Sequence, residues 1–223
     1  MAHLPSAVLL ALAMAALAYL AGSIPFGYLI ARSQGVDIFK AGSGNIGATN
    51  VRRVLGRGPG NLCFALDVLK GLVPTLAAGL ALGTLGNIEA SQSQVWLWLL
   101  SPVAAVVGHM YSPWLGFRGG KGVATGLGAL LGVYWVLTFS VLGALVVWLV
   151  IVRIWRYVSL GSICAAVSVP VWALVFPLMY YQGFEPTTLP MVVVAMLLAG
   201  FVVAKHRANL ARILSGTEHR TRT

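Results

Sequence analysis

The sequence predicts an all-α, polytopic integral membrane protein with seven transmembrane helices in a single membrane domain over residues 1–223. Of the 223 residues, 59% are hydrophobic and only 9% are charged, whereas a soluble domain usually carries about 25% charged residues. Apolar runs of roughly 20 residues recur, and each is long enough to cross a bilayer core of about 30 Å. These runs must be helical, because lipid offers no hydrogen-bond partners to the backbone.

The first apolar run, Ala7–Ile30, is expected to be an uncleaved helix rather than a signal peptide. No Lys or Arg precedes it, and it is too long for an ordinary signal-peptide core. The other runs are Asn61–Leu85, Val95–Ser112, Val123–Val152, Val158–Tyr180 and Leu189–Ala204.

The positions of the Lys and Arg residues predict the orientation of these helices. Fourteen of the 15 lie outside the apolar runs, and the positive-inside rule places them in the cytoplasm. This puts the N-terminus outside, the C-terminus inside, and both ends of Val123–Val152 on the cytoplasmic side. That run must therefore enter and return, either as two short helices turning near Gly132–Val136 or as a re-entrant hairpin. The fourteen residues form four clusters: Arg32, Lys40, Arg52, Arg53 and Arg57; Arg118 and Lys121; Arg153 and Arg156; Lys205, Arg207, Arg212, Arg220 and Arg222.

The net charge of +10 follows from this sidedness, so we expect no nucleic-acid partner. The two cysteines, Cys63 and Cys164, lie inside apolar runs without metal-ligand spacing. We therefore expect neither a disulfide framework nor a metal site.

The first of three polar segments spans residues 40–57 and contains GSGNIGATNVRR. Its G-x-G-x-x-G spacing matches a dinucleotide fingerprint only by letter, because a membrane helix precedes it and no βαβ unit follows. Glycines expose backbone N–H groups that can cradle an anion, and arginine can bind phosphate bidentately. We expect an anion site here rather than a flexible loop. The candidate residues are Gly42, Ser43, Gly44, Asn45, Thr49, Asn50 and Arg53.

The second segment spans residues 108–125 and contains FRGGKGVAT. It is not a Walker A motif, because Leu115 stands where the first glycine is required and Gly122 where Ser or Thr is required. Lys121 nevertheless stands among glycines at the start of a helix, where the dipole favours anions. A snorkelling lysine is the alternative for Lys121, and an interfacial polar cap is the alternative for His109. The candidate phosphate-binding glycines are Gly119, Gly120 and Gly122.

The third segment spans residues 205–218 and contains HRANLAR followed by GTE. His206 and Asn209 are three residues apart and share a helix face. Arg207 and Arg212 could instead be simple topogenic charges.

Asp67 and Lys70 are also three residues apart, inside a predicted span. Intramembrane charges are costly and are usually functional or paired, so a structural ion pair and a functional role both remain open. We place both residues, together with His109 and Glu218, as candidates that support the site.

Together these segments resemble the PlsY family of bacterial acyl-phosphate:glycerol-3-phosphate acyltransferases. GSGNIGATNVRR, FRGGKGVAT and HRANLAR with its trailing GTE occur in the family's order and spacing. The ALDVLKG stretch around Asp67 and Lys70 is similar too, and the resemblance extends from Gly22 nearly to the C-terminus. One departure is Ile46, where many relatives carry a proline; Ile46 carries no chemistry, so the assigned roles are unaffected.

The resemblance implies that an acyl phosphate donates its acyl chain to the 1-hydroxyl of glycerol 3-phosphate. The products would be lysophosphatidic acid and inorganic phosphate, in an early step of phospholipid synthesis. It also implies seven helices in the bacterial inner membrane, a cytoplasmic active site, and a partner enzyme that supplies the acyl phosphate. No cofactor is expected, because an acyl phosphate is already activated. Besides membrane lipid, the two substrates are the expected partners.

The resemblance also implies roles for individual residues. Lys121 would stabilise the donor phosphate, and His206 and Asn209 would orient glycerol 3-phosphate. Either His206 or a substrate phosphate oxygen could accept the hydroxyl proton. Arg207 would add a further counter-charge. The residues expected to line one phosphate site are Ser43, Asn45, Thr49, Asn50 and Arg53.

Three other classes can be weighed against this assignment. Another glycerolipid acyltransferase class carries H-x-x-x-x-D, but Trp114 follows His109 at that spacing and Ala211 follows His206. A transporter of organic phosphates would favour polar residues at the membrane midplane, whereas these lie at the cytoplasmic ends. A non-catalytic lipid-binding protein is the remaining alternative.

Overall fold

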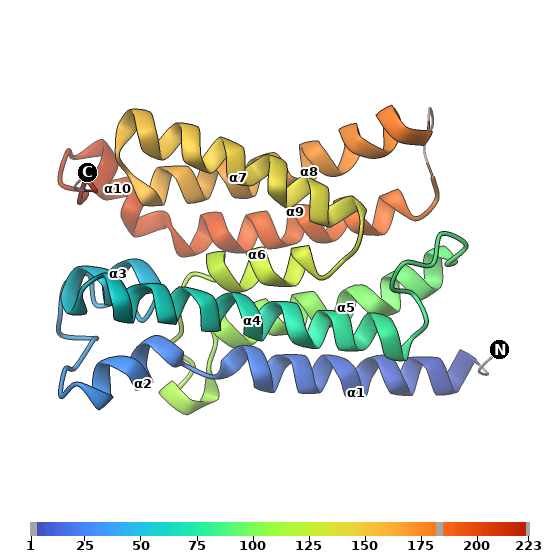
Figure 1. Cartoon of the computed structure of the whole chain (residues 1–223), viewed down its shortest axis with the longest axis horizontal. Coiled ribbons are helices and arrows are strands. Elements are labelled where there is room, and N and C mark those ends of the chain that lie inside the picture. The colour runs from blue at the N-terminus through green and yellow to red at the C-terminus, as the bar shows by residue number, and fades with distance from the viewer. Residues whose placement is uncertain (1–3, 182–184, 222–223) are drawn as a thin grey trace.

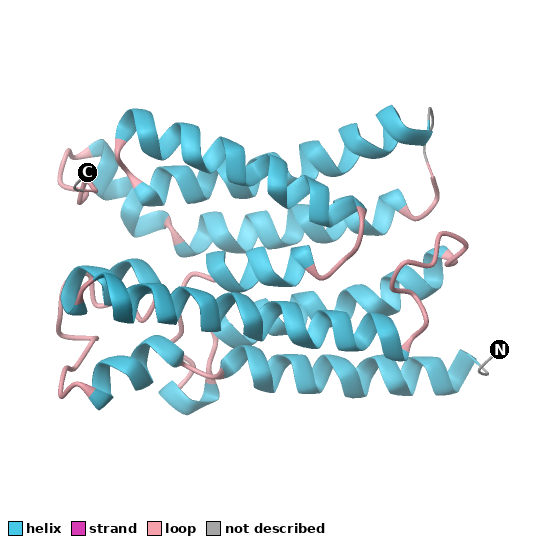
Figure 2. Ribbon diagram, in the orientation of Figure 1, coloured by secondary structure: helices cyan, strands magenta, loops and turns pink. Residues whose placement is uncertain are grey.

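The computed structural model describes residues 4–181 and 185–221, and the regular elements in these ranges are all helices (Figure 2). The long helices run roughly side by side along the long axis of the molecule (Figure 1). The all-α prediction is confirmed for this part of the chain. In order, the elements are α1 (Leu4–Ser23), α2 (Phe26–Ser33), α3 (Ala48–Leu55), α4 (Arg57–Ala81), α5 (Gln92–Met110), η1 (Pro113–Leu115), α6 (Val123–Leu131), α7 (Val136–Trp155), α8 (Val158–Tyr181), α9 (Thr188–Lys205) and α10 (Arg207–Leu214).

Large apolar side chains face outward along the long helices, as expected of a protein embedded in lipid. Leu9 is 68% exposed, Leu80 is 69% exposed and Met179 is 76% exposed. In the described residues, six helical stretches are long and apolar enough to cross a membrane. The multi-pass membrane prediction is therefore confirmed.

The predicted single helix Ala7–Ile30 is wrong in one respect, because the structure divides this run into α1 and α2 at Ile24–Pro25. Proline has no backbone N–H, and its ring disfavours helical geometry in the residue before it. The two parts still form one apolar stretch, Pro5–Ser33, of spanning length.

The predicted span Val123–Val152 consists of two helices that turn at residues 132–135, close to the expected position. The second helix, α7, has 20 residues and is of spanning length. The first helix, α6, has only 9 residues, or about 14 Å at 1.5 Å per residue, and is too short to cross alone. Of the two short helices expected here, α6 is indeed short, whereas α7 has full spanning length and is one of the six spanning stretches in the described residues.

The two ends of the chain lie at opposite ends of the bundle (Figure 1). Six crossings alone would return the chain to the end where it started, so the positions of the two ends agree with an odd number of passages. Seven spans, with the N-terminus outside and the C-terminus inside, remain a prediction.

The basic clusters gather at the end of the bundle that holds α3 and α10 (Figure 1). Glu89 and Glu185 lie in the connections at the other end, and Arg222 lies outside the described residues. The positive-inside rule predicts that the basic end is cytoplasmic.

The short helix α6 packs against both α4 and α5. Gly128 on α6 lies so close to the Val68 carbonyl on α4 that a Cβ would overlap it. This close approach seats the start of α6, and therefore Lys121, against the helix that carries Asp67.

Candidate active site

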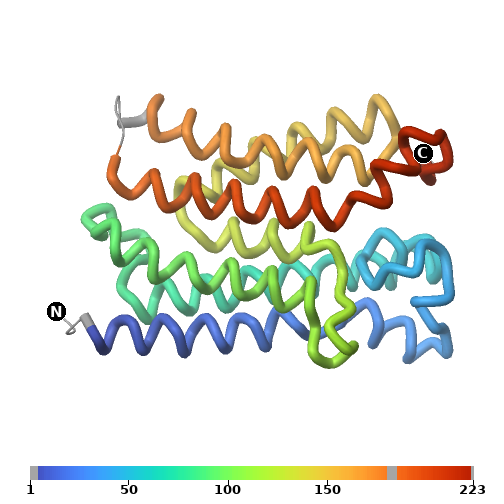
Figure 3. The backbone as a smooth tube through the Cα atoms, turned by 180° about the vertical axis from the view of Figure 1, so that it is seen from behind, coloured from blue at the N-terminus to red at the C-terminus, as the bar shows by residue number. Residues whose placement is uncertain are grey.

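The three polar segments predicted to form the site lie at the same end of the bundle. Seen from behind, the segment before α3, the connection from α5 to α6, and α10 all lie toward the end that carries the C-terminus (Figure 3). Lys121 Nζ donates a 2.6 Å hydrogen bond to Asn209 Oδ1, which joins the second segment to the third. Arg53 lies near enough to Lys121 to affect its pKa, which brings in the first segment.

Asn50 organises the first segment from within. This side chain is only 2% exposed, and its Oδ1 accepts from the Ser43 backbone N–H at 2.8 Å and from Arg53 at 3.2 Å. Its Nδ2 donates to the carbonyls of Ala41 and Asn45 at 3.0 and 2.9 Å. One amide therefore shapes the glycine loop and orients the arginine beside it.

The glycine loop has the backbone conformation expected of an anion cradle. Gly42 and Gly44 have φ values of 59° and 68°, in the left-handed region that glycine adopts readily. Asn45 Oδ1 accepts a 2.8 Å hydrogen bond from the Gly47 N–H. Ser43 and Thr49 are exposed, so their hydroxyl groups are accessible to a ligand.

Asn209 is the central residue of the contact between the second and third segments. Besides accepting from Lys121, it donates a 2.6 Å hydrogen bond from Nδ2 to Glu218 Oε1. Glu218 also accepts from Ser159 at 2.7 Å and from Arg212 at 2.8 Å. Burial alone would raise the pKa of Glu218, but these three donors lower it overall, so the carboxylate stays charged.

Lys121 is half-buried and carries a perturbed ammonium group. Burial is the main cause that lowers its pKa to about 8, and Arg212 and Arg53 lower it further while Glu218 opposes them. The lysine is therefore mostly protonated at neutral pH but close to its titration range.

His206 is 2% exposed and bonds the Val202 carbonyl through Nδ1 at 2.8 Å. Because a carbonyl only accepts, Nδ1 carries the hydrogen and Nε2 has its lone pair available. Burial and the nearby Lys121 lower the pKa of His206 to about 4, against the opposing effects of the Val202 carbonyl and Glu218. The imidazole is therefore neutral near pH 7.

Asp67, Lys70 and His109 are not at the surface of this site. All three are buried in the interior beneath it, where Lys70 Nζ lies 2.8 Å from Asp67 Oδ1. The predicted ion pair is therefore present. Of the remaining candidates, Arg207 is exposed at the start of α10, and Gly119, Gly120 and Gly122 lie in the connection that leads into α6.

Sequence reasoning missed Ser159 and treated Arg212 only as a topogenic charge. Both bind Glu218, and Ser159 comes from the start of α8, 59 residues before it in the chain. No local pattern connects residues so far apart. Arg212 could have been suspected because Glu218 follows it within one short segment.

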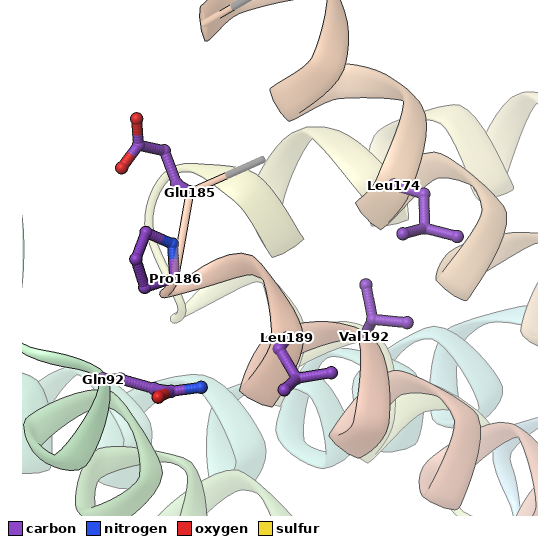
Figure 4. Close-up of a pocket in the computed structure, with 6 residues that line it drawn as sticks. All are labelled: Gln92, Leu174, Glu185, Pro186, Leu189 and Val192. Carbon is purple, nitrogen blue, oxygen red and sulfur yellow. The ribbon is translucent and has the colours of Figure 1, made fainter. Parts of the chain in front are cut away.

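A separate apolar pocket of about 290 Å³ lies at the opposite end of the bundle (Figure 4). Its walls come from α5, α8 and α9, and the Glu185 side chain points away from Leu174 and Val192. With one carboxylate and no cation, it is unsuited to phosphate. The lining residues are Gln92, Leu174, Glu185, Pro186, Leu189 and Val192. Within the described ranges, no group of three His, Cys, Asp or Glu side chains could hold a metal ion.

Known proteins match the chain over nearly its whole length. The model of a family described as glycerol-3-phosphate acyltransferase matches residues 12–216. A glycerol-3-phosphate acyltransferase of Trichlorobacter lovleyi is 44% identical over 201 residues, covering 90% of this chain and 92% of the relative. The protein of the same name in Geobacter sulfurreducens is 46% identical over 209 residues, covering 94% and 96% respectively.

Two solved structures point to the same family. A crystal structure described as PlsY (YgiH), an integral membrane glycerol 3-phosphate acyltransferase in its glycerol 3-phosphate form, is 41% identical. It superposes with a TM-score of 0.81 over 96% of each chain. The lysophosphatidic acid form of that protein gives a TM-score of 0.78 at the same identity and coverage. The chain therefore belongs to the glycerol-3-phosphate acyltransferase family, as the PlsY resemblance predicted.

Proposed function

We propose that this protein transfers a fatty acyl chain from an acyl phosphate to the 1-hydroxyl of glycerol 3-phosphate. The observation that carries the proposal is the contact of Lys121 with Asn209, beside Arg53 and His206, at one end of a membrane bundle. The site would face the cytoplasm of a bacterial inner membrane. A separate enzyme would supply the lipid-soluble donor.

The proposed reaction makes one carbon–oxygen bond and breaks another. The glycerol hydroxyl oxygen attacks the acyl carbon, and the bond from that carbon to the phosphate oxygen breaks. The products are lysophosphatidic acid and inorganic phosphate, and the hydroxyl proton ends on the phosphate. The leaving group is already good, so positioning and electrostatic stabilisation supply most of the catalysis.

The site must hold two phosphates against their mutual repulsion. Together they bring about four negative charges near neutral pH, because second phosphate pKa values lie near 6. Lys121, Arg53 and Arg207 would provide the counter-charges, and the glycine segments would provide backbone N–H groups. We assign Lys121 to the donor phosphate, where charge develops as the acyl–oxygen bond breaks.

His206 would orient glycerol 3-phosphate rather than remove its proton. With a pKa near 4, its neutral Nε2 can accept a hydrogen bond from the substrate hydroxyl but holds a transferred proton weakly. A phosphate oxygen, with a pKa nearer 6, is the better final acceptor.

The test of the proposed function uses purified protein in detergent with glycerol 3-phosphate and alternative acyl donors. Acyl phosphate should give lysophosphatidic acid and inorganic phosphate in equal amounts. An acyl thioester should give no product, because its leaving group is a thiolate and not the phosphate that Lys121 would bind. If the thioester gave lysophosphatidic acid and the acyl phosphate did not, the donor assignment would be overturned. A transporter or non-catalytic lipid-binding protein would release no phosphate above background.

Replacing His206 by glutamine tests the role of this imidazole. We expect the variant to keep a few per cent of the wild-type rate with an unshifted pH profile, because glutamine can still hydrogen-bond the hydroxyl. The measurement is kcat/KM for glycerol 3-phosphate from about pH 3.5 to pH 9, a range that includes the pKa of His206 near 4. If kcat/KM falls at low pH in the wild type but no longer does so in the variant, His206 is the general base.

The pKa of Lys121 predicts an alkaline limit to activity. Because this pKa is lowered to about 8, the free enzyme loses the ammonium charge as pH rises through that value. We expect kcat/KM to fall above about pH 8, since this ratio reports ionisation of the free enzyme. In Lys121→Arg, which is slower but remains charged, the alkaline fall should disappear. An unchanged fall in that variant would contradict the assignment.

A further inference from the structure

The buried ion pair beneath the site lies against His109 of the second glycine segment and is linked to the first segment through Cys63. Asp67 and Lys70 side chains are each 3% exposed, and that of His109 is 4% exposed. Burying charge in a membrane is costly even when it is paired. The contacts of Asp67 show what this cluster connects.

One set of contacts leads from Asp67 to the first glycine segment. Cys63 Sγ lies 3.7 Å from Asp67 Oδ2 and 3.9 Å from the Ile46 carbonyl oxygen. Ile46 is 2% exposed and lies inside the loop that Asn50 shapes. The carboxylate is therefore one side chain away from this loop.

A second set of contacts leads to the second glycine segment. His109 Nδ1 lies 3.7 Å from Asp67 Oδ1, and the His109 backbone carbonyl accepts a 3.0 Å hydrogen bond from the Gly120 N–H. The His109 ring packs directly against Gly120, where an added Cβ would overlap Nε2. Gly120 immediately precedes Lys121, so the ring supports the backbone that carries the lysine.

Lys70 connects the same cluster to a third part of the chain, the break between α1 and α2. Its Nζ donates a 2.7 Å hydrogen bond to the Ile24 carbonyl at the break between α1 and α2, where this carbonyl also accepts from the Phe26 N–H at 3.1 Å. The ammonium group also lies 5.6 Å from the centre of the Phe26 ring. Lys70 thus balances the carboxylate while anchoring it to the helix pair that leads into the first segment.

We propose that Asp67 and His109 are positioning residues that hold the two glycine segments at the separation their two phosphates require. Lys70 holds the carboxylate in place through their 2.8 Å ion pair. The inference rests on the proposed function and adds residues that do not touch substrate. A cluster that only stabilised the fold would have no effect on the affinity of correctly folded molecules for phosphate substrates.

The test measures KM for both substrates, kcat and melting temperature in purified variants. Asp67→Asn combined with Lys70→Met removes both charges, so no unpaired charge is left buried. We expect this double variant and His109→Ala to raise KM for at least one substrate by tenfold or more. Ser101→Ala is the matched control, because it removes a buried α4–α5 hydrogen bond away from the cluster, to the Pro74 carbonyl. Its KM values should stay within twofold of wild type.

A double-mutant cycle between His109 and Gly120 tests the second contact separately. Gly120→Ala introduces a Cβ that overlaps the His109 ring, and His109→Ala makes room for it. We expect the combined variant to have a lower KM than the two single effects predict when multiplied. If the fold-changes in KM of the two single variants simply multiply in the combined variant, this part of the proposal is overturned.

Two failures can be told apart. If wild-type protein forms no lysophosphatidic acid, the proposed function fails. If wild type is active but the charge-free double variant and His109→Ala keep KM within twofold of wild type for both substrates, only the positioning role is overturned. A lower melting temperature with unchanged KM would show that the cluster merely stabilises the fold.

Discussion

Lys121→Ala is expected to lower kcat at least about 100-fold. The ammonium group, held by Asn209 at 2.6 Å, would face the phosphate oxygen on which charge develops. Loss of one preorganised donor to such a charge typically costs 10²–10³ in kcat, or roughly 3–4 kcal/mol at 1.36 kcal/mol per tenfold. The rate is measured by phosphate release at saturating concentrations of both substrates.

The matched control for this change is Lys40→Ala. Lys40 is another cation at the same end, with a side chain that is 86% exposed and paired with Asp37. Its replacement should leave kcat within twofold of wild type. Lys121→Arg should not restore the full rate, because a planar guanidinium differs from a compact ammonium in shape. A Lys121→Ala enzyme within threefold of wild type would refute the assigned role.

Asn50→Asp is expected to lower kcat/KM by about 100-fold although the two side chains have nearly the same shape. Asn50 donates to the carbonyls of Ala41 and Asn45, whereas an ionised aspartate only accepts hydrogen bonds. Each buried group left without its partner costs about 1–3 kcal/mol, so two such losses are enough to open the glycine loop. Steady-state kinetics for both substrates measure the effect.

Asn87→Asp is the control for this isosteric change. Asn87 is exposed at the opposite end of the bundle and donates to the Gly83 carbonyl at 3.2 Å. Water can replace that hydrogen bond, so kcat/KM should stay within twofold of wild type. If Asn50→Asp behaved like this control, Asn50 would not organise a phosphate-binding loop.

Much of the fold could be predicted because apolar length decides which segments cross a membrane. The predicted run Val158–Tyr180 matches α8 to within one residue, and Leu189–Ala204 likewise matches α9. The break at Pro25 was missed because the apolar run continues through it. The turn at residues 132–135, and with it the short length of α6, lies close to the prediction, but the packing of α6 against α4 and α5 could not be predicted from the chain.

The candidate site could be predicted where its residues lie close together in the sequence. Glycines, Asn50 and Arg53 lie in one short segment, so their grouping is visible in the chain. The bond between Lys121 and Asn209 joins residues 88 positions apart, and only the resemblance of the three segments to one family indicated that they meet. The contact of Asp67 with His109 needed the structure, because it depends on how α4 packs against α5, whereas Cys63 lies only four residues before Asp67 on α4.

The central claim is that three separate segments form one phosphate-binding pocket on a single face of the membrane. The direct measurement labels single cysteines in membrane vesicles of known orientation with a reagent that cannot cross lipid. Lys40→Cys, Arg118→Cys and Ala208→Cys are exposed positions beside the three segments. Glu89→Cys is an exposed position at the other end. Native Cys63 is fully buried, and Cys164 is replaced by serine.

We expect the first three cysteines to be labelled from the cytoplasmic side only, and Glu89→Cys from the opposite side only. If any of the three segments were labelled from the compartment opposite to the others, a shared pocket could not exist.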